Sequence, residues 1–416
     1  MKFIVSQLTS RRDYDVAKIL VQEGMLEKLC TDFYYDDNNK MLRMISKIIP
    51  EKYSSLLKKQ TAYIPVDLVL HDLYAGLRFR FDIKTMSYKE RHKYQIRAYK
   101  KINENIIKYA GSINFTKGIY GFDTGSLELY RWSKPRGCYL ILEQCVAPRA
   151  TQVRSHETIL KKINNVSCIN KLDLVPYKIL EEREVEEWSL ADIIICPSLY
   201  VKNELEKAGV ASTKLKLINY GYDNLKNSQD LQIIIEKRFV PYSNRKFQVF
   251  FAGSDGFRKG IHDVLAIAKR LFGENIIFII AGNLSKECLS YINKNQTSNI
   301  KYVGKLNRNQ MQKCYEESDI FLFPSYLEGS ALVTYEAMSW GLPLITTYES
   351  GSVMEDQKQG FLSNAGDTDK MAKDILFILM NQQIRYELSI NSINRLSQFS
   401  QENYKENLLK ILRKSC

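Results

Sequence analysis

The sequence predicts an α/β protein of two domains, each built on a parallel sheet with helices on both faces. The chain has 416 residues, which is long enough for two hydrophobic cores. In its second half, continuous apolar runs such as FQVFFAG (247–253) alternate with segments of helical spacing. Apolar runs separated by helices are typical of parallel strands that are buried on both faces.

The second half contains the clearest elements of this fold. After the first strand, apolar residues at Val264, Leu265, Ala268 and Leu271 predict a helix over 261–272. The same reasoning predicts strands at 276–282, 301–306, 320–325 and 342–347, and helices at 285–294, 308–317 and 331–340. Ligands of such sheets bind beyond the carboxyl ends of the strands. We therefore expect a site around the loop 253–260 and Glu328.

The first half follows the same plan less regularly. We expect strands at 3–8, 138–144, 192–198 and 214–221, and an amphipathic helix from about Tyr14. The polar stretch 222–245 has no clear periodicity and is expected to link the two domains. The segment 399–416 has the spacing of an amphipathic helix with a basic end.

The composition excludes several classes of protein. No apolar run reaches the roughly 18 residues that span a bilayer, and the start of the chain lacks the apolar core of a secretory signal. The eight cysteines form neither a C-x-x-C pair nor a cluster with histidine. We therefore expect reduced thiols in a cytoplasmic protein, with neither zinc nor disulfides.

Most of the positive charge lies in the first half. The formal net charge is +13, and residues 1–220 contain 36 basic and 26 acidic residues, an excess of 10. The stretch 78–101 alone has nine basic and two acidic residues. An anionic membrane surface, an acidic substrate or nucleic acid would suit this charge, and so would a solvated face without a partner. Because no nucleic-acid-binding motif or stacking platform accompanies the run, we expect no nucleic-acid partner.

The segment 88–109 has Ile96, Tyr99, Ile102 and Ile106 on one face and basic residues on the rest. A basic amphipathic helix of this kind can lie on an anionic membrane. This pattern gives the hypothesis of peripheral attachment to the inner face of the plasma membrane. The alternative is a helix packed into the core with a solvated basic face.

Residues 321–343, FLFPSYLEGSALVTYEAMSWGLP, carry the strongest functional signal. A strand runs into a Pro-Ser turn, a loop presents Glu328, and a helix from about Ala331 carries Glu336 near its first turn. The N–H groups between the glutamates lie at a helix N-terminus, which favours a phosphate or diphosphate because its donors are unpaired. The layout suits a diphosphate with a hydroxyl-rich group on either side, as in a nucleotide-sugar. Alternatively, the two carboxylates only stabilise the start of a helix.

Several motifs in this order make the chain similar to the retaining glycosyltransferases of family 4 (group 1). They are the Pro-Ser turn, E-x7-E, A-M-x-x-G-x-P, GSDGFRKG (253–260) and ESGSVMEDQKQGFL (349–362). In the first half, ADIIICPSLYVKNELEKAGV (191–210) and KLKLINYGYD (214–223) resemble the end of the family's first domain. The resemblance covers roughly residues 180–400, and more weakly the first 180.

The resemblance implies the GT-B architecture, in which two Rossmann-like domains face a cleft and the C-terminal helix crosses back to the first domain. It divides the chain into an acceptor-binding domain (1–225), a nucleotide-sugar-binding domain (226–395) and a C-terminal helix on the first domain (396–416).

The resemblance also implies roles for single residues. Glu336 matches the glutamate that binds the ribose hydroxyls, Glu328 the one that contacts the transferred sugar, and Lys259 the lysine that neutralises the leaving diphosphate. The residues expected to line the donor pocket are Gly253, Ser254, Gly304, Gly329, Ser330, Ala331 and Leu332, the last four through their N–H groups. The resemblance implies a nucleotide-diphosphate-sugar as co-substrate and no metal or other cofactor. It also implies that the configuration at the anomeric carbon is retained.

The sequence departs from the family at two places. Ser254 follows Gly253 where the family usually has an arginine, so we expect Arg258 to supply the second positive charge. Many members have a histidine after the strand 138–144, where this chain has Arg149 and, farther on, His156. His156 is then either a catalytic histidine or an ordinary residue of a surface helix.

Three residues beyond the first strand, Arg11, Arg12 and Asp13, are acceptor-side candidates. Asp13 also suits the N-cap of a helix that begins at Tyr14.

The resemblance therefore predicts a retaining hexosyltransferase that moves a sugar from a nucleotide-sugar to a glycan, glycolipid or other hydroxyl acceptor, as in polysaccharide biosynthesis. The alternative is an isomerase similar to nucleotide-sugar 2-epimerases, which share the architecture. Such an isomerase needs acid/base groups in its cleft, and the four histidines of this chain are few and poorly placed. A non-catalytic binding protein of the same fold is a third hypothesis.

Overall fold

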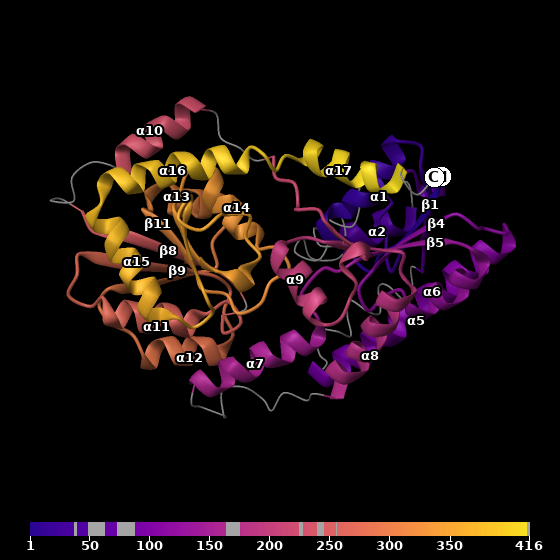
Figure 1. Cartoon of the computed structure of the whole chain (residues 1–416), viewed down its shortest axis with the longest axis horizontal. Coiled ribbons are helices and arrows are strands. Elements are labelled where there is room, and N and C mark those ends of the chain that lie inside the picture. The colour runs from indigo at the N-terminus through magenta and orange to yellow at the C-terminus, as the bar shows by residue number, and fades with distance from the viewer. Residues whose placement is uncertain are drawn as a thin grey trace.

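The computed structural model describes residues 1–36, 40–48, 63–72, 88–163, 175–223, 228–238, 245–254 and 256–413. Two domains lie side by side, each with a parallel sheet between layers of helices (Figure 1). This arrangement confirms the predicted α/β class with two Rossmann-like domains.

The sheet of the first domain has the strand order β3-β2-β1-β4-β5-β6-β7. The order reverses between β1 and β4, and ligands of such sheets bind at the carboxyl ends beside this reversal. Its strands are β1 (Phe3–Ser6), β2 (Leu26–Thr31), β3 (Val69–His71), β4 (Gly118–Phe122), β5 (Tyr139–Glu143), β6 (Ile193–Cys196) and β7 (Leu215–Leu217). Its helices are α1 (Asp15–Gln22), α2 (Lys40–Ile48), α5 (Tyr88–Ser112), α6 (Leu127–Ser133), α7 (Arg149–Ile163), α8 (Val175–Leu190) and α9 (Leu199–Lys207).

The sheet of the second domain has the order β10-β9-β8-β11-β12-β13, which reverses between β8 and β11. Its strands are β8 (Phe247–Ala252), β9 (Ile276–Ala281), β10 (Ile300–Gly304), β11 (Ile320–Phe323), β12 (Leu344–Thr347) and β13 (Gly360–Ser363). Its helices are α10 (Ser228–Arg238), α11 (Ile261–Arg270), α12 (Lys286–Lys294), α13 (Arg308–Glu317), α14 (Leu332–Ser339), α15 (Thr368–Met380) and α16 (Gln382–Leu396).

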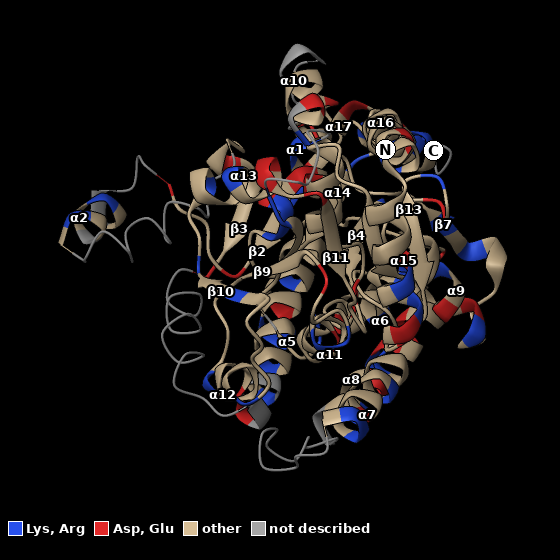
Figure 2. Ribbon diagram, turned by 90° about the vertical axis from the view of Figure 1, so that its left-hand side faces the viewer, with Lys and Arg blue, Asp and Glu red and all other residues tan. Residues whose placement is uncertain are grey.

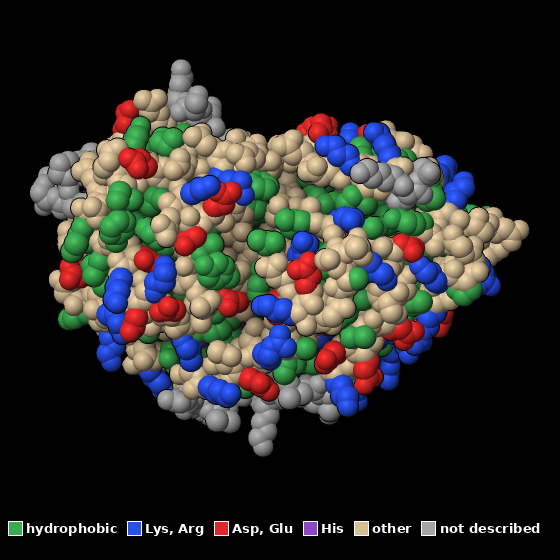
Figure 3. Space-filling model, viewed as in Figure 1, with side chains coloured by type: hydrophobic (Ala, Val, Ile, Leu, Met, Phe, Trp, Pro, Cys, Tyr) green, Lys and Arg blue, Asp and Glu red, His purple; other side chains and the backbone are tan. Residues whose placement is uncertain are grey.

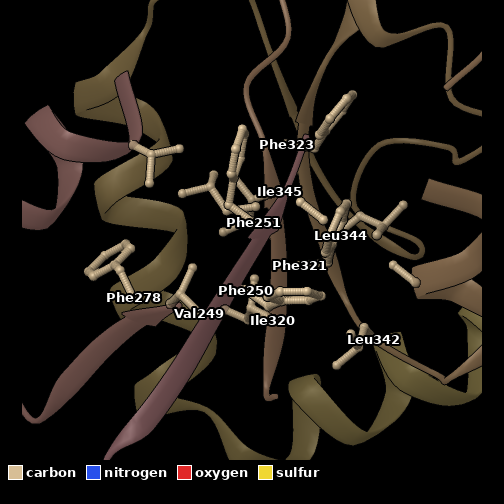
Figure 4. Packing of buried hydrophobic residues seen from close by; sticks show 14 of the residues in the cluster. Val249, Phe250, Phe251, Phe278, Ile320, Phe321, Phe323, Leu342, Leu344 and Ile345 are labelled. Atoms are coloured by element: carbon tan, nitrogen blue, oxygen red, sulfur yellow. The ribbon is translucent and has the colours of Figure 1, made fainter. Parts of the chain in front are cut away.

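Strand β11 is apolar along its whole length, and β8 is apolar except for Gln248, because helices cover both faces of their sheet. Phe250 and Phe321 are fully buried, and their rings meet edge to face at 5.8 Å (Figure 4). The next residue of β8 points to the opposite face. There Phe251 and Phe323 stack at 6.3 Å. Both faces of these central strands are therefore core, and their carboxyl ends are held rigidly.

The predicted linker 222–245 contains a helix. Helix α10 (Ser228–Arg238) packs on the second domain, where the Arg238 guanidinium donates to the carbonyls of Tyr315 (2.8 Å) and Trp340 (2.7 Å). The residues on either side of it, 224–227 and 239–244, lie outside the described ranges.

After α16 the chain returns to the first domain as α17 (Gln401–Arg413) (Figure 1). There Glu23 accepts ion pairs from Lys405 (3.0 Å) and Arg413 (2.8 Å). Leu408 and Leu412 are fully buried in the core of the first domain. The return of the C-terminal helix is thus part of the confirmed architecture, while the boundaries at 225 and 395 stay predictions.

The basic helix α5 packs its apolar face into the first domain. Ile106 is fully buried and Ile102 is 8% exposed, and both belong to a core cluster beneath the sheet. Helix α5 is therefore packed into the core, the second of the two predicted alternatives, because the sheet and α6 cover its apolar face. The outward face carries exposed basic residues (Figure 2): Lys93, Arg97, Lys100, Lys101 and Lys108. The rest of the predicted basic run, 78–87, lies outside the described residues.

Helix α1 does not start as expected. It begins at Asp15 with Tyr14 as its N-cap residue, so the prediction that Asp13 caps it is wrong. Arg12, Asp13 and Tyr14 have positive φ angles of 49°, 50° and 59°. This left-handed turn buries the Tyr14 ring, whose hydroxyl donates to the Phe33 carbonyl at 3.2 Å, and leaves Asp13 exposed.

Within the described part of the chain, no helix is long and apolar enough to cross a membrane. Six cysteines fall in this part and are free thiols, whereas Cys168 and Cys416 lie outside it.

Candidate active site

The loops that follow β8 and β11 meet beside the point where the strand order of the second sheet reverses. Gly260, at the start of α11, makes this meeting close: a Cβ on it would lie 2.0 Å from the Pro324 carbonyl oxygen. Its φ of +80° also favours glycine. Glycine here brings the two loops together at the place where a parallel sheet binds its ligands.

The two loops bring Lys259, Arg258 and Glu328 into one cluster. The Lys259 Nζ donates to Glu328 Oε1 at 2.5 Å, and the Arg258 guanidinium donates to the same oxygen at 3.0 Å. The Ser325 hydroxyl adds a third bond at 3.2 Å. All three charged side chains are mostly buried, with exposed fractions of 16%, 24% and 13%. The cluster thus joins two cations to one carboxylate, a pairing that the sequence did not predict.

The start of α14 presents backbone donors, though not the set that was expected. The N–H of Ala331 donates to the Ser350 carbonyl at 3.0 Å and is therefore taken. Within the described residues, no acceptor takes the N–H groups of Gly329, Ser330, Leu332 or Val333. Of the four N–H groups predicted to face the ligand, that of Ala331 is therefore already taken, while the N–H of the neighbouring Val333 is open in the described part of the chain. Glu336 is the fifth residue of α14, so it lies just past the first turn, close to where it was expected.

The other donor-side residues differ in their surroundings. Gly253 lies beneath the stem of Lys259, whose Cβ, Cγ and Cδ would each be 3.3 Å from a Cβ on the glycine. Ser254 is exposed near the start of the loop 253–260. Gly304 ends β10 with a φ of +74° and has open space where a Cβ would lie. All three lie at the carboxyl ends of β8 and β10, which flank β9 in the sheet.

The first domain contacts this region through the loops after β5 and β6. A Cβ on Gly329 would lie 1.9 Å from the Cys145 carbonyl oxygen, so the two backbones touch. The Ser198 hydroxyl donates to the Gly329 carbonyl at 2.5 Å. The exposed Arg11 donates to the same Cys145 carbonyl at 3.2 Å, which places Arg11 beside the contact. Of the acceptor-side candidates, Arg11 therefore lies next to the donor loop.

Arg149 is held inside the first domain. Its guanidinium bonds Asp123 at 3.1 Å, and its backbone N–H donates to Glu184 at 2.5 Å. Burial raises the pKa of Glu184 to about 8 against the opposing effect of Arg149. Arg149 thus serves to order the loop after β5 rather than to offer a free charge.

Two further candidates also have partners in the first domain. The guanidinium of Arg12 lies between the rings of Tyr220 and Tyr404, at 4.0 and 4.3 Å, and so fixes α17. His156 lies on α7 with its Nε2 3.3 Å from the Tyr177 hydroxyl of α8. That contact supports the reading of His156 as an ordinary helix residue.

Sequence reasoning missed Asp123 and Ser198. Asp123 follows β4 at the reversal of the first sheet, and it accepts from the Cys145 N–H (3.0 Å) as well as from Arg149. An acidic residue directly after a strand is a usable signal, but β4 itself, GIYGF, was not recognised. Ser198 caps α9 through the Val201 N–H (3.2 Å), and this cap hides its contact with the other domain.

The site can hold a polyanion between two kinds of donor. Lys259 and Arg258 lie in the loop between β8 and α11, and free N–H groups lie at the start of α14 after β11. Charge-assisted bonds from cations and from a helix N-terminus are those that bind phosphate groups.

Two Rossmann-like domains in contact at the carboxyl ends of their sheets, with a returning C-terminal helix, define the GT-B class of folds. The crystal structure of Anabaena Alr3699/HepE in complex with UDP is similar, with a TM-score of 0.62 over the whole of both chains at 15% identity. At this identity the likeness shows the fold alone.

Residues 234–395, in the second domain, match the family described as Glycosyl transferases group 1. The sulfoquinovosyl transferase SQD2 of Arabidopsis thaliana is 29% identical over 206 residues, which are 47% of this chain and 39% of that protein. The capsular polysaccharide biosynthesis glycosyltransferase CapM of Staphylococcus aureus is 24% identical over 217 residues, 50% of this chain and 54% of that one. The chain thus spans about half the length, or less, of these two curated relatives. Both relatives are named as transferases, so the comparison does not favour the isomerase alternative.

Proposed function

We propose that the protein is a retaining glycosyltransferase that moves a sugar from a nucleotide-diphosphate-sugar to a hydroxyl acceptor. The observation that carries this proposal is the pair of cations, Lys259 and Arg258, beside the free N–H groups at the start of α14. A diphosphate needs compensation from both sides, and this arrangement offers it. The family match of this domain supports the same ligand class.

In the reaction, the bond between the anomeric carbon and the β-phosphate oxygen breaks, and a bond to the acceptor oxygen forms. The proton of the acceptor hydroxyl passes to the leaving diphosphate. Negative charge builds up on the leaving diphosphate, and placed cations and N–H donors stabilise it most. Glu328 neutralises both cations in the ligand-free protein. We infer that the diphosphate takes over Lys259 and Arg258, which releases the Glu328 carboxylate toward the sugar.

This charge compensation comes from the protein's own side chains, and we propose that the transfer needs no metal ion. Turnover in excess EDTA should match turnover in added Mg²⁺. A loss of turnover in EDTA that Mg²⁺ restores contradicts this part of the proposal. Retention is tested by the anomeric coupling in the proton NMR spectrum of the first product: an inverted product contradicts it.

We propose a glycan, a glycolipid or another hydroxyl compound as the acceptor. The support is indirect: the relative CapM is named for capsular polysaccharide biosynthesis. On this chain, Arg11 beside Cys145 is the first residue to test on the acceptor side. Arg11→Ala should raise the KM for the acceptor while the KM for the donor stays the same, and a change in the donor KM alone contradicts this placement.

Attachment to an anionic membrane is proposed here through charge alone, since the apolar face of α5 is buried. The support is the outward row of basic residues on this helix. On the face seen in Figure 3, basic and acidic side chains are interspersed. At low salt the protein should float together with vesicles of acidic lipids and should not float with vesicles of neutral lipids. Equal flotation with both, or with neither, contradicts the proposal.

A panel of nucleotide-sugars tests the activity itself. We expect release of a nucleoside diphosphate from one donor, abolished by Glu328→Ala. Glu317→Ala is a matched control, because Glu317 is an exposed glutamate at the end of α13 in the same domain. Interconversion of two nucleotide-sugars without release contradicts transfer and supports the isomerase.

A further inference from the structure

The only hydrogen-bond donor to Glu336 among the described residues is a buried tyrosine. The Tyr315 hydroxyl on α13 donates to Glu336 Oε2 at 2.9 Å. The other oxygen, Oε1, accepts nothing within the described residues, and the side chain is half-buried. The carboxylate thus has one oxygen fixed to the protein and one open.

Tyr315 is itself held on every side. It is 2% exposed, and its ring meets Phe250 edge to face at 5.1 Å and stacks on Trp340 at 6.4 Å. The Arg238 guanidinium binds its carbonyl at 2.8 Å. Burial, with the negative charge of Glu336, raises the pKa of Tyr315 well above its ordinary value, so the hydroxyl keeps its proton. The donor is therefore rigid and permanent.

We propose that Tyr315 is the positioning residue for Glu336, and that it sets the preference of the site for ribonucleotides over 2′-deoxyribonucleotides. This inference rests on the proposed function, in which Glu336 binds the ribose hydroxyls. A carboxylate selects a diol only if its orientation is fixed before the ligand arrives, since otherwise binding must also order it. Tyr315 fixes that orientation through Oε2 and leaves Oε1 for the ribose.

The substitution Tyr315→Phe isolates the hydroxyl, because the ring and its contacts with Phe250 and Trp340 remain. The probes are UDP, GDP and ADP, each with its 2′-deoxy counterpart, titrated calorimetrically into the full chain. The quantity measured is the ratio of the two Kd values, deoxy over ribo. For the tightest-binding base we expect a ratio of about 10 in the parent protein and a fall of about threefold or more in Tyr315→Phe.

Tyr326→Phe is the matched control. Tyr326 is also 2% exposed, and its hydroxyl also donates to a carboxylate of the second domain, Asp263 at 2.8 Å. Because that carboxylate is not Glu336, the ratio should stay within about twofold of the parent. The melting temperature of each variant, measured in parallel, shows that a changed ratio comes from a folded protein.

Three outcomes overturn the inference, and they separate it from the proposed function. If Glu336→Gln lowers the ratio and Tyr315→Phe does not, the role of Tyr315 is wrong while the ribose contact stands. If Tyr326→Phe lowers the ratio as much as Tyr315→Phe, the effect is general and the inference also fails. If Glu336→Gln leaves the ratio unchanged, or if no nucleoside diphosphate binds, that part of the proposed function fails and takes the inference with it.

Discussion

At the scale of single residues, Lys259 carries the largest share of the proposed chemistry. Removing one placed donor from a developing negative charge typically costs 10²- to 10³-fold in kcat. We therefore expect Lys259→Met to lower kcat by about that factor, because Arg258 is then the one cation of the cluster left beside the N–H groups of α14 to compensate the diphosphate. Initial rates of nucleoside diphosphate release measure it.

Lys358→Met is the control for this substitution. Lys358 belongs to the same domain, but it is 67% exposed and pairs with Glu355 at 2.6 Å. Its rate should equal that of the parent. A Lys259→Met protein that keeps more than about a third of the parent rate would contradict the role of the lysine.

Residues in a linear motif could be predicted from the sequence, and residues with distant partners could not. Glu328, Glu336 and Lys259 stand in ordered motifs, so the sequence alone brought attention to them. The surroundings of Arg149 depend on Asp123 and Glu184, which are 26 and 35 positions away. Likewise, nothing near Ala331 in the sequence shows that the Ser350 carbonyl takes its N–H.

At the scale of elements, an ion pair joins α6 to α8. The Arg183 guanidinium donates to both oxygens of Glu128, at 2.7 and 2.8 Å, and Asn103 of α5 adds a bond at 3.0 Å. Burial alone would raise the pKa of Glu128, but the bonds from Arg183 outweigh it and lower the pKa from 4.5 to about 2. Because the folded pKa lies below the unfolded one, the stabilisation is fully present above pH 4.5 and is lost as the pH falls through about 2.

Glu128→Gln should therefore lower the free energy of unfolding at pH 7 by about 2 kcal/mol, since a bond to a charged group is lost. The difference from the parent should shrink between pH 4.5 and pH 2. Denaturant unfolding at several pH values measures both effects. The matched control is Glu186→Gln, whose exposed pair with Arg131 should contribute less than about 1 kcal/mol. A difference that does not depend on pH contradicts the account.

Elements that are apolar throughout could be predicted from the sequence, and short or mixed ones could not. The central strands of the second domain, β8 and β11, have a single polar residue, Gln248, because both faces are core. In the first domain, β2 contains Glu27 and Lys28, and β4 contains two glycines, so neither run resembles a buried strand. The periodicity of α5 was evident, but only the fold shows that its apolar face lies against the sheet.

At the scale of the whole molecule, the two domains touch where Gly329 meets Cys145. Gly329→Ala would put a Cβ 1.9 Å from the Cys145 carbonyl oxygen, so the loops must separate. We expect nucleoside diphosphate binding to persist, because its groups lie in the second domain. Turnover should fall by about 10²-fold, the usual cost of misplacing reactants by about 1 Å.

Small-angle scattering measures the separation of the domains in Gly329→Ala through the radius of gyration, and initial rates measure its turnover. Ser198→Ala is the comparison, because it removes the hydrogen bond to the Gly329 carbonyl without adding a clash. Its turnover should fall by less than about tenfold, in line with the loss of one hydrogen bond. An unchanged radius of gyration and unchanged turnover in Gly329→Ala would show that the contact does not matter.

The sequence was sufficient for two domains and for the loops that hold Lys259 and Glu328, because both depend on local patterns. The contact between the domains could not be predicted. It depends on Ser198 and Gly329, which are 131 positions apart, and on Lys162 of α7, which donates to the Gly366 carbonyl at 2.5 Å. Pairings of this kind follow only from how the two sheets are set against each other.

The most direct test of the proposed donor site is a crystal structure of the full chain with a bound nucleoside diphosphate. The proposal predicts its β-phosphate within hydrogen-bond distance of Lys259 and of the N–H groups at the start of α14, with the ribose hydroxyls on Glu336 Oε1. A nucleotide bound elsewhere, with the Lys259–Glu328 pair intact, would contradict it.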